Sequence, residues 1–97
     1  MTRQLVLRPR AERDIQSAFQ SYELQRAGLG DEFLRALRAR LDLISDFPES
    51  CPVLYRSIRR GVVSPFPYVV FYFAQPTRVV VLALLHQSRD PAIWPRR

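Results

Sequence analysis

The sequence contains no lysine, because all fifteen of its basic residues are arginine. Arginine binds phosphate and carboxylate groups through paired hydrogen bonds, but its pKa above about 12 prevents it from acting as a proton-transfer base at neutral pH. Histidine is the side chain that ordinarily titrates near neutrality, and the sequence has one, His86. Acid–base chemistry that needs lysine is therefore excluded, and His86 is the one credible general base.

The sequence has a single cysteine and no long hydrophobic run. Cys51 has no second cysteine with which to form an internal disulfide, which favours a reducing compartment. The longest apolar run, residues 79–85, is far shorter than the roughly 20 residues that span a membrane. The first ten residues also lack the apolar core of a secretory leader. We therefore expect a cytoplasmic protein with no membrane segment.

Acidic residues are almost absent from the second half of the chain. Residues 1–50 contain eight arginines and eight acids, whereas residues 51–97 contain seven arginines and one acid. The formal net charge of +6 therefore belongs to the second half. Such a charge favours binding to a nucleic acid or to an acidic protein, and the charge alone does not distinguish them.

Apolar spacing in the first half predicts a short strand and two helices. Residues 4–7 alternate as a strand does, and apolar residues three and four apart then indicate a helix that begins near Pro9 and stops near Gly28. A second helix is expected from Asp31 until Pro48 ends it. Because the connection is short, the helices should form an antiparallel hairpin. The expected buried stripes are Ala11, Ile15, Ala18, Phe19 and Tyr22, and then Phe33 or Leu34, Leu37, Leu41, Ile44 and Phe47.

The second half predicts strands. Residues 53–63 read as one strand or two short ones, and two β-branched and aromatic runs, residues 68–73 and 79–85, flank a polar connection of hairpin length. The last run is apolar on both faces, which predicts a central strand. In the run before it, we expect Tyr68 and Tyr72 to face solvent or a partner, because each hydroxyl needs a hydrogen-bond partner.

Together these elements predict an α+β fold: an N-terminal strand and an antiparallel helix hairpin packed on a twisted, mostly antiparallel sheet of about four strands. We expect one domain over residues 1–97, in which residues 91–97, PAIWPRR, form an irregular tail because they are rich in proline. Trp94, Arg96 and Arg97 in this tail are residue types that often dominate protein interfaces. Trp94 either serves such an interface or closes the core.

Four short motifs follow one another along the chain: GLGDEFL at the start of the second helix, IRR on a strand, FPYVVFY in the hairpin and LLHQSRDPAIW at its end. In this order, and with this order of elements, they resemble the RelE/ParE toxin superfamily of type II toxin–antitoxin systems over nearly the whole chain. The resemblance implies a cognate antitoxin whose acidic or amphipathic segment wraps and neutralises the toxin as a hetero-oligomer. It implies no cofactor and no metal.

Members of the superfamily divide by target. RelE-like toxins cut messenger RNA on the ribosome, and ParE-like toxins inhibit DNA gyrase. RelE-like nucleases concentrate lysines, arginines and a late tyrosine, whereas this sequence has no lysine and no aromatic residue between His86 and Trp94. The run LLHQS resembles the ParE-like branch. The resemblance therefore favours a toxin that arrests growth by binding a type II topoisomerase; the alternatives are a RelE-like endoribonuclease and an inactive domain that only binds its antitoxin.

These alternatives use different residues. A ribonuclease would use His86 as its base, matching the late histidine of related ribonucleases of this fold, with Arg59, Arg60 or Arg89 on the phosphate. Because adjacent strand residues point to opposite faces, at most one of Arg59 and Arg60 can join a given site. His86 can instead bond a backbone group or Asp90 at the end of its strand, or recognise a partner. A binding toxin would contact its target or antitoxin through Arg56, Arg59, Arg60, Tyr68, Tyr72, Arg78, Trp94, Arg96 and Arg97.

Overall fold

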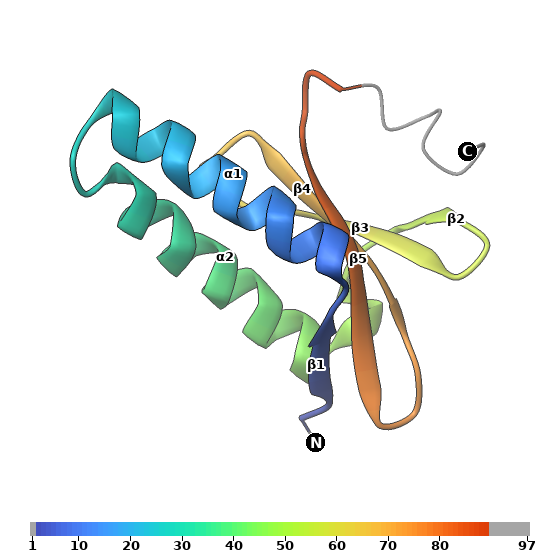
Figure 1. Ribbon diagram of the computed structural model, residues 1–97. Helices are drawn as coiled ribbons and strands as arrows, with labels where there is room; N and C mark the ends of the chain where they lie inside the picture. The colour runs from blue at the N-terminus through green and yellow to red at the C-terminus, as the bar shows by residue number, and fades with distance from the viewer. Residues whose placement is uncertain (1, 90–97) are drawn as a thin grey trace.

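Two helices and five strands make up the fold in the computed structural model, which describes residues 2–89 (Figure 1). The expected tail at residues 91–97 and Asp90 lie outside the described residues. The elements in chain order are β1 (Gln4–Leu7), α1 (Pro9–Gln25), α2 (Leu29–Asp46), the 3-10 turn η1 (Pro48–Ser50), β2 (Val53–Tyr55), β3 (Ile58–Val62), β4 (Tyr68–Ala74) and β5 (Arg78–His86).

The five strands form one sheet in the order β1-β5-β4-β3-β2. β1 runs parallel to β5, and every other neighbouring pair is antiparallel. The sheet has five strands rather than about four because residues 53–63 form two strands, divided by a turn in which Arg56 adopts a positive φ of 54°. The predicted α+β class is confirmed, and so is the central position of β5, which lies between β1 and β4.

Two glycines, Gly28 and Gly30, allow the short connection and the close contact between α1 and α2. Gly28 precedes α2 with a left-handed φ of 90°. The Glu23 carboxylate accepts hydrogen bonds from the backbone amides of Gly28 (3.1 Å) and Gly30 (2.8 Å). A Cβ atom on Gly30 would lie 2.7 Å from ring carbons of Phe19. The helices can approach this closely because residue 30 has no side chain. Both glycines of the GLG sequence therefore have a structural role, Gly28 in the turn and Gly30 in the helix contact.

The antiparallel helix hairpin is as expected, but its helix ends differ in two details. α2 begins at Leu29 rather than at Asp31, because Gly28 turns the chain directly into the helix. Asp31 lies in the first turn, where its charge is favourable at the positive end of the helix dipole. Phe47 was expected in the buried stripe and is 63% exposed, because it follows the last helical residue with a non-helical φ of −135°.

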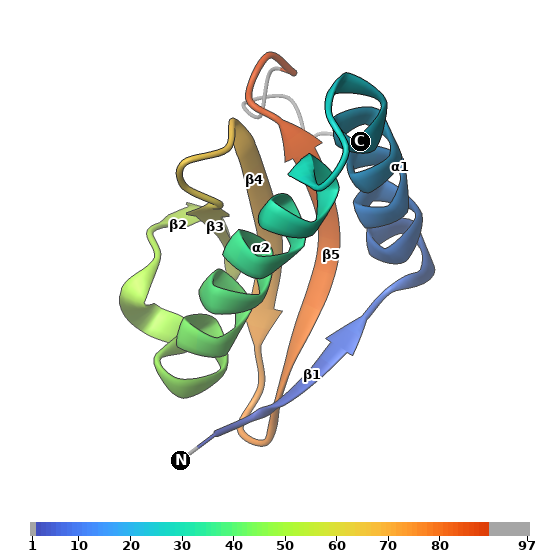
Figure 2. The same ribbon diagram turned by 90° about the vertical axis from the view of Figure 1, so that its left-hand side faces the viewer.

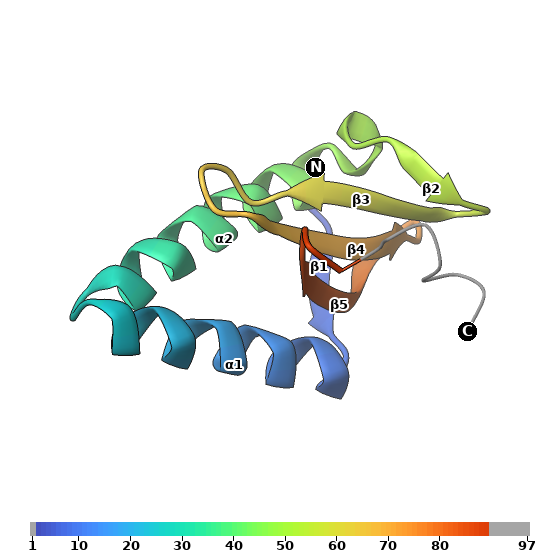
Figure 3. The same ribbon diagram turned by 90° about the horizontal axis from the view of Figure 1, so that it is seen from above.

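Both helices pack on the same face of the sheet, which we call the helix-side face (Figures 2 and 3). Here Tyr22, Phe33, Phe66 and Tyr68 pack ring against ring, with centroids 5.1 to 5.9 Å apart. The opposite face has a smaller apolar cluster whose described members all come from strands, and we call it the helix-free face. Its members are Val69, Phe71 and Ala83, with the partly buried Leu54, Ile58, Val62 and Leu85 around them.

A β-bulge changes the alternation of side chains along β5. Phe71 pairs with Ala83, but the next residue of β4, Tyr72, pairs with Val81, so Leu82 has no opposite residue. As a result Val81 and Leu84 both contribute to the helix-side core, whereas Ala83 lies in the helix-free cluster. Strict alternation does not predict this arrangement, because the extra residue reverses the facing of every side chain beyond it.

The tyrosine face of β4 is buried, which contradicts the sequence expectation. Tyr72 has 0% of its surface exposed, and its hydroxyl donates a 2.6 Å hydrogen bond to the backbone carbonyl of Pro48. Burial raises the pKa of the Tyr72 phenol well above its ordinary value, and the neighbouring Cys51 adds to this shift. Tyr68 is half-buried in the aromatic cluster. The expectation failed because the hydroxyl of Tyr72 finds its partner in η1 rather than in solvent.

Candidate functional site

His86 is the last residue of β5 and lies opposite Tyr68 of β4, with the two rings edge to face at 5.2 Å. Its Nδ1 atom accepts a 2.9 Å hydrogen bond from the backbone amide of Ser88. A neutral imidazole has one acceptor nitrogen, so the other nitrogen, Nε2, carries the proton. In this arrangement His86 bonds a backbone group and has no free lone pair with which to remove a proton from a substrate.

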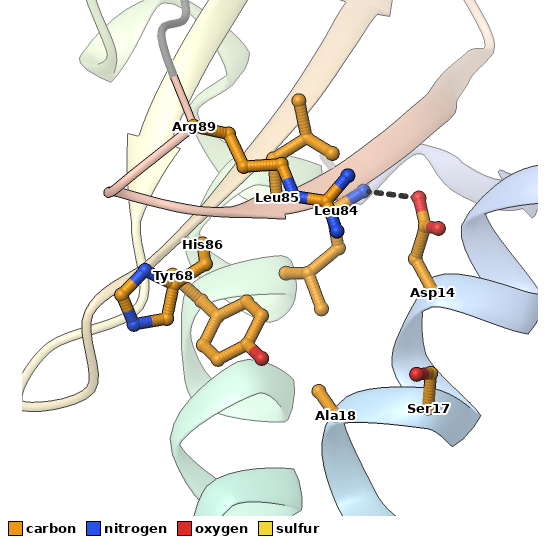
Figure 4. Close-up of a pocket in the computed structure, with 8 residues that line it drawn as sticks. All are labelled: Asp14, Ser17, Ala18, Tyr68, Leu84, Leu85, His86 and Arg89. Carbon is orange, nitrogen blue, oxygen red and sulfur yellow. Dashed lines mark hydrogen bonds between the residues drawn. The ribbon is translucent and has the colours of Figure 1, made fainter. Parts of the chain in front are cut away.

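A small pocket of about 90 Å³ lies beside His86, between α1 and the end of β5 (Figure 4). The Asp14 carboxylate accepts a 3.0 Å hydrogen bond from the backbone amide of Leu84 and lies 3.5 Å from Nε of Arg10. The carboxylate of this pocket is thus already engaged in holding the fold. The lining residues are Asp14, Ser17 and Ala18 of α1, Tyr68 of β4, and Leu84, Leu85, His86 and Arg89.

The contact between Asp14 and Leu84 has a topological cause. The register of β1 against β5 ends where Leu7 meets Val81, so the edge of β5 beyond that point has no neighbouring strand. α1 follows β1 and begins beside this open edge (Figure 1), and its Asp14 side chain supplies the acceptor that a strand would otherwise provide.

Arg59 and Arg60 lie on opposite faces of the sheet, as the sequence predicts. Arg59 pairs with Tyr72, and its Nη1 donates a 2.7 Å hydrogen bond to the backbone carbonyl of Cys51. Arg60 pairs with Phe71 and therefore belongs to the helix-free face. Its Nε atom is buried without a hydrogen-bond partner. The two adjacent arginines are consequently in different environments: Arg59 bonds the backbone, whereas the Nε atom of Arg60 is buried without a hydrogen bond.

The candidate catalytic residues do not form one site. His86 lies opposite Tyr68, whereas Arg59 lies opposite Tyr72 of the same strand, which separates the two positions by about 13 Å along β4. Arg60 faces the other side of the sheet. The pocket beside β5 brings together two of the four candidates, His86 and Arg89.

The remaining candidate binding residues have separate locations. Arg56 lies in the turn between β2 and β3, where its guanidinium stacks 5.2 Å from the centre of the Tyr55 ring. Arg78 begins β5 and donates a hydrogen bond to the side chain of Gln75. Tyr72 has no exposed surface with which to contact a partner. Trp94, Arg96 and Arg97 lie outside the described residues.

A groove along the helices was absent from the sequence candidates. It opens between β1, α1 and α2, and most of its lining surface is apolar. The sequence did indicate apolar residues here, since Ile15 and Phe19 fall on the predicted buried stripe of the first helix. In the structure both are only partly buried, and they line the groove. The residues that line the groove are Leu7, Glu12, Ile15, Gln16, Phe19 and Leu34.

Ion pairs and basic charge are segregated between the helices and the sheet. The salt bridges within the described residues all lie on the helices or their connection: Arg10–Asp14, Arg26–Glu32 and Arg38–Asp42. Residues 51–89 hold five arginines and no acid.

The described part of the chain has no helix long and apolar enough to cross a membrane. It also has no group of three His, Cys, Asp or Glu side chains placed to hold a metal ion.

These features define a small α+β domain whose sheet half is basic and whose candidate catalytic side chains are dispersed. The family model for the ParE toxin of the type II toxin–antitoxin system parDE matches residues 5–91, and the chain belongs to this family. A solved structure described as a chromosomal ParDE toxin–antitoxin system from P. aeruginosa has the same fold, with a TM-score of 0.76 at 8% identity over 88% of this chain and 96% of that one. No curated protein matches the sequence.

Proposed function

We propose that this protein is a toxin that arrests growth by binding and inhibiting a type II topoisomerase, DNA gyrase, and that a cognate antitoxin from the same operon neutralises it. The observation that carries the proposal is the dispersal of the candidate catalytic groups in a member of the ParE toxin family. The acceptor nitrogen of His86 is occupied by Ser88, and Arg59 and Arg60 face opposite sides of the sheet. Inhibition by protein binding needs no such group.

The basic sheet half is the proposed contact surface. None of its five described arginines forms an ion pair within the described residues, so a partner that supplies carboxylates gains favourable charge interactions with them. In this proposal toxin, antitoxin and gyrase meet in the cytoplasm, and the toxin forms a hetero-oligomer with the antitoxin.

Plasmid topology in living cells tests the proposed target. Induction of the toxin alone is expected to relax negatively supercoiled plasmid DNA before protein synthesis stops, and co-induction of the antitoxin is expected to prevent both effects. Cleavage of messenger RNA at ribosomes with unchanged plasmid supercoiling would exclude gyrase as the target. Absence of growth arrest would favour an inactive domain that only binds its antitoxin.

The second candidate is a RelE-like endoribonuclease that uses His86. The observation that favours it is the pocket in which His86 and Arg89 lie together, since a base and a cation for the phosphate are two of the groups that RNA cleavage needs. This candidate requires that the His86→Ala substitution abolishes toxicity while antitoxin binding survives. The binding proposal instead expects His86→Ala to remain toxic.

A further inference from the structure

Arg60 has an unusual environment for a charged side chain. It stands on β3 directly opposite Phe71, in the row of residues that forms the helix-free face. Ile58 and Val62, two residues before and after it on the same strand, flank it on that face. Arginine at this position interrupts an otherwise apolar surface.

One donor of the Arg60 guanidinium lacks a hydrogen-bond partner. Its Nε atom is buried and makes no hydrogen bond. A buried donor of a charged group without an acceptor is costly, and nearly all such donors in folded proteins are satisfied. Arg59, its neighbour, shows the ordinary outcome, because its guanidinium bonds the carbonyl of Cys51. The free toxin therefore retains an unmet hydrogen-bonding requirement at Arg60.

The shape and chemistry around Arg60 favour a carboxylate as its ligand. The Nε and one Nη of a guanidinium form a fork that matches the two oxygens of a carboxylate. Within the described residues no carboxylate pairs with Arg60, because the ion pairs there are Arg10–Asp14, Arg26–Glu32 and Arg38–Asp42. The apolar side chains on either side of Arg60 are suited to contact apolar side chains that flank the carboxylate.

We infer that Arg60 on the helix-free face is the anchor for an acidic side chain of the antitoxin, held between apolar residues of the same antitoxin segment. The assignment rests on the proposed toxin–antitoxin pairing. It names the antitoxin rather than the target because apolar contacts that surround a desolvated ion pair are typical of long-lived complexes. A nucleic acid fits less well, because binding its phosphate backbone requires several basic side chains on one surface, whereas Arg59 and Arg60 lie on opposite faces of the sheet.

The Arg60→Met substitution tests this assignment with two measurements that should move in opposite directions. Methionine keeps an unbranched side chain as far as the position of Nε and places a methyl group where the unmet donor was, so the free toxin is expected to be at least as stable toward urea as the unaltered protein. Affinity for the antitoxin expressed from the adjacent reading frame is expected to fall by roughly 30-fold or more, because the antitoxin carboxylate loses its buried partner. A residue that only supported the fold would lower both quantities together.

Two matched variants complete the test. Arg60→Lys keeps the charge without the fork and is expected to recover part of the affinity. Arg35→Ala removes the same charge from the exposed surface of α2 and is expected to change affinity less than about threefold, as surface charges usually do. If the Arg60→Met and Arg35→Ala variants bound the antitoxin equally well, the assignment of Arg60 would be overturned, but the toxin–antitoxin pairing would stand. Failure of the unaltered toxin to bind the antitoxin would overturn the pairing and the assignment together.

The Nε–H resonance of Arg60 gives an independent measurement in the assembled pair. Its proton is expected to shift downfield and exchange slowly with solvent when the antitoxin binds, whereas the Nε–H resonance of Arg35 should stay unchanged. An unchanged Arg60 resonance in the complex would contradict the assignment. A comparable, Arg60-dependent affinity for single-stranded RNA in the absence of antitoxin would assign the site to nucleic acid instead.

Discussion

The hydroxyl of Tyr72 in β4 donates a 2.6 Å hydrogen bond to the backbone carbonyl of Pro48, which follows α2 in the chain. This bond joins the middle of the sheet to the turn that leads out of the helix hairpin. Both groups are buried, and neither has water available as a substitute partner. The bond therefore fixes where the chain leaves the helices and begins the sheet.

Replacement of Tyr72 by phenylalanine should destabilise the protein by about 1–2 kcal/mol, because the carbonyl of Pro48 stays buried without a donor. Urea unfolding followed by circular dichroism measures the change. Tyr68→Phe is the matched control, since the Tyr68 hydroxyl makes no hydrogen bond within the described residues and its removal should cost much less. Equal losses for the two variants would contradict the structural role given to the bond.

Alkaline pH should destabilise the protein through Tyr72. Burial raises the pKa of Tyr72 above its ordinary value, and burial also raises the pKa of Tyr22, with Tyr68 contributing. The folded state then keeps protons that the unfolded state releases above about pH 10, so the free energy of unfolding falls as pH rises from there. The measured slope should be smaller in Tyr72→Phe. A slope that is the same in both proteins would show that Tyr72 does not cause it.

Substitution of the two glycines in the helix connection, Gly28 and Gly30, should lower stability for different physical reasons. Gly30→Ala places a methyl group 2.7 Å from the Phe19 ring and should cost about 1–3 kcal/mol, because the helices must separate. Gly28→Ala has open space around it and should cost about 1–2 kcal/mol through its positive φ alone. Gly28→Asn should recover part of that loss, since asparagine tolerates this conformation. Thermal unfolding of the three variants distinguishes the mechanisms, and a harmless Gly30→Ala would contradict the close helix contact.

The Asp14→Ala substitution should open the edge of β5. The amide of Leu84 loses its acceptor, which is expected to cost about 1 kcal/mol and to accelerate hydrogen exchange at that amide. Asp42→Ala, which removes a surface ion pair with Arg38, should change stability by less than about 0.5 kcal/mol. Unaltered exchange at Leu84 in Asp14→Ala would show that α1 does not protect this edge.

Much of the fold was predictable because local patterns and tertiary structure agree. The apolar stripe of the first helix, the glycines before the second and the polar connection at residues 75–77 each indicate their element from sequence alone. Long-range geometry was less accessible. The bulge at Leu82 and the turn at Arg56 depend on how strands pair, and neither leaves a clear mark in the composition.

The candidate site was predictable in its residues but not in their arrangement. The sequence identifies His86 and the arginines of the second half, and it predicts that Arg59 and Arg60 face apart. It does not show that Ser88 occupies the acceptor nitrogen of His86, because that bond depends on how the chain turns after β5. Nor does it distinguish Arg59, whose guanidinium bonds the carbonyl of Cys51, from Arg60, whose buried Nε atom has no hydrogen-bond partner.

A supercoiling assay with purified gyrase tests the central proposal most directly. The toxin should inhibit the introduction of negative supercoils, His86→Ala should inhibit equally well, and prior addition of the antitoxin should restore supercoiling. A parallel reaction with ribosomes and messenger RNA should show no cleavage. Undiminished supercoiling together with ribosome-dependent cleavage that disappears in His86→Ala would contradict the proposal and establish the endoribonuclease in its place.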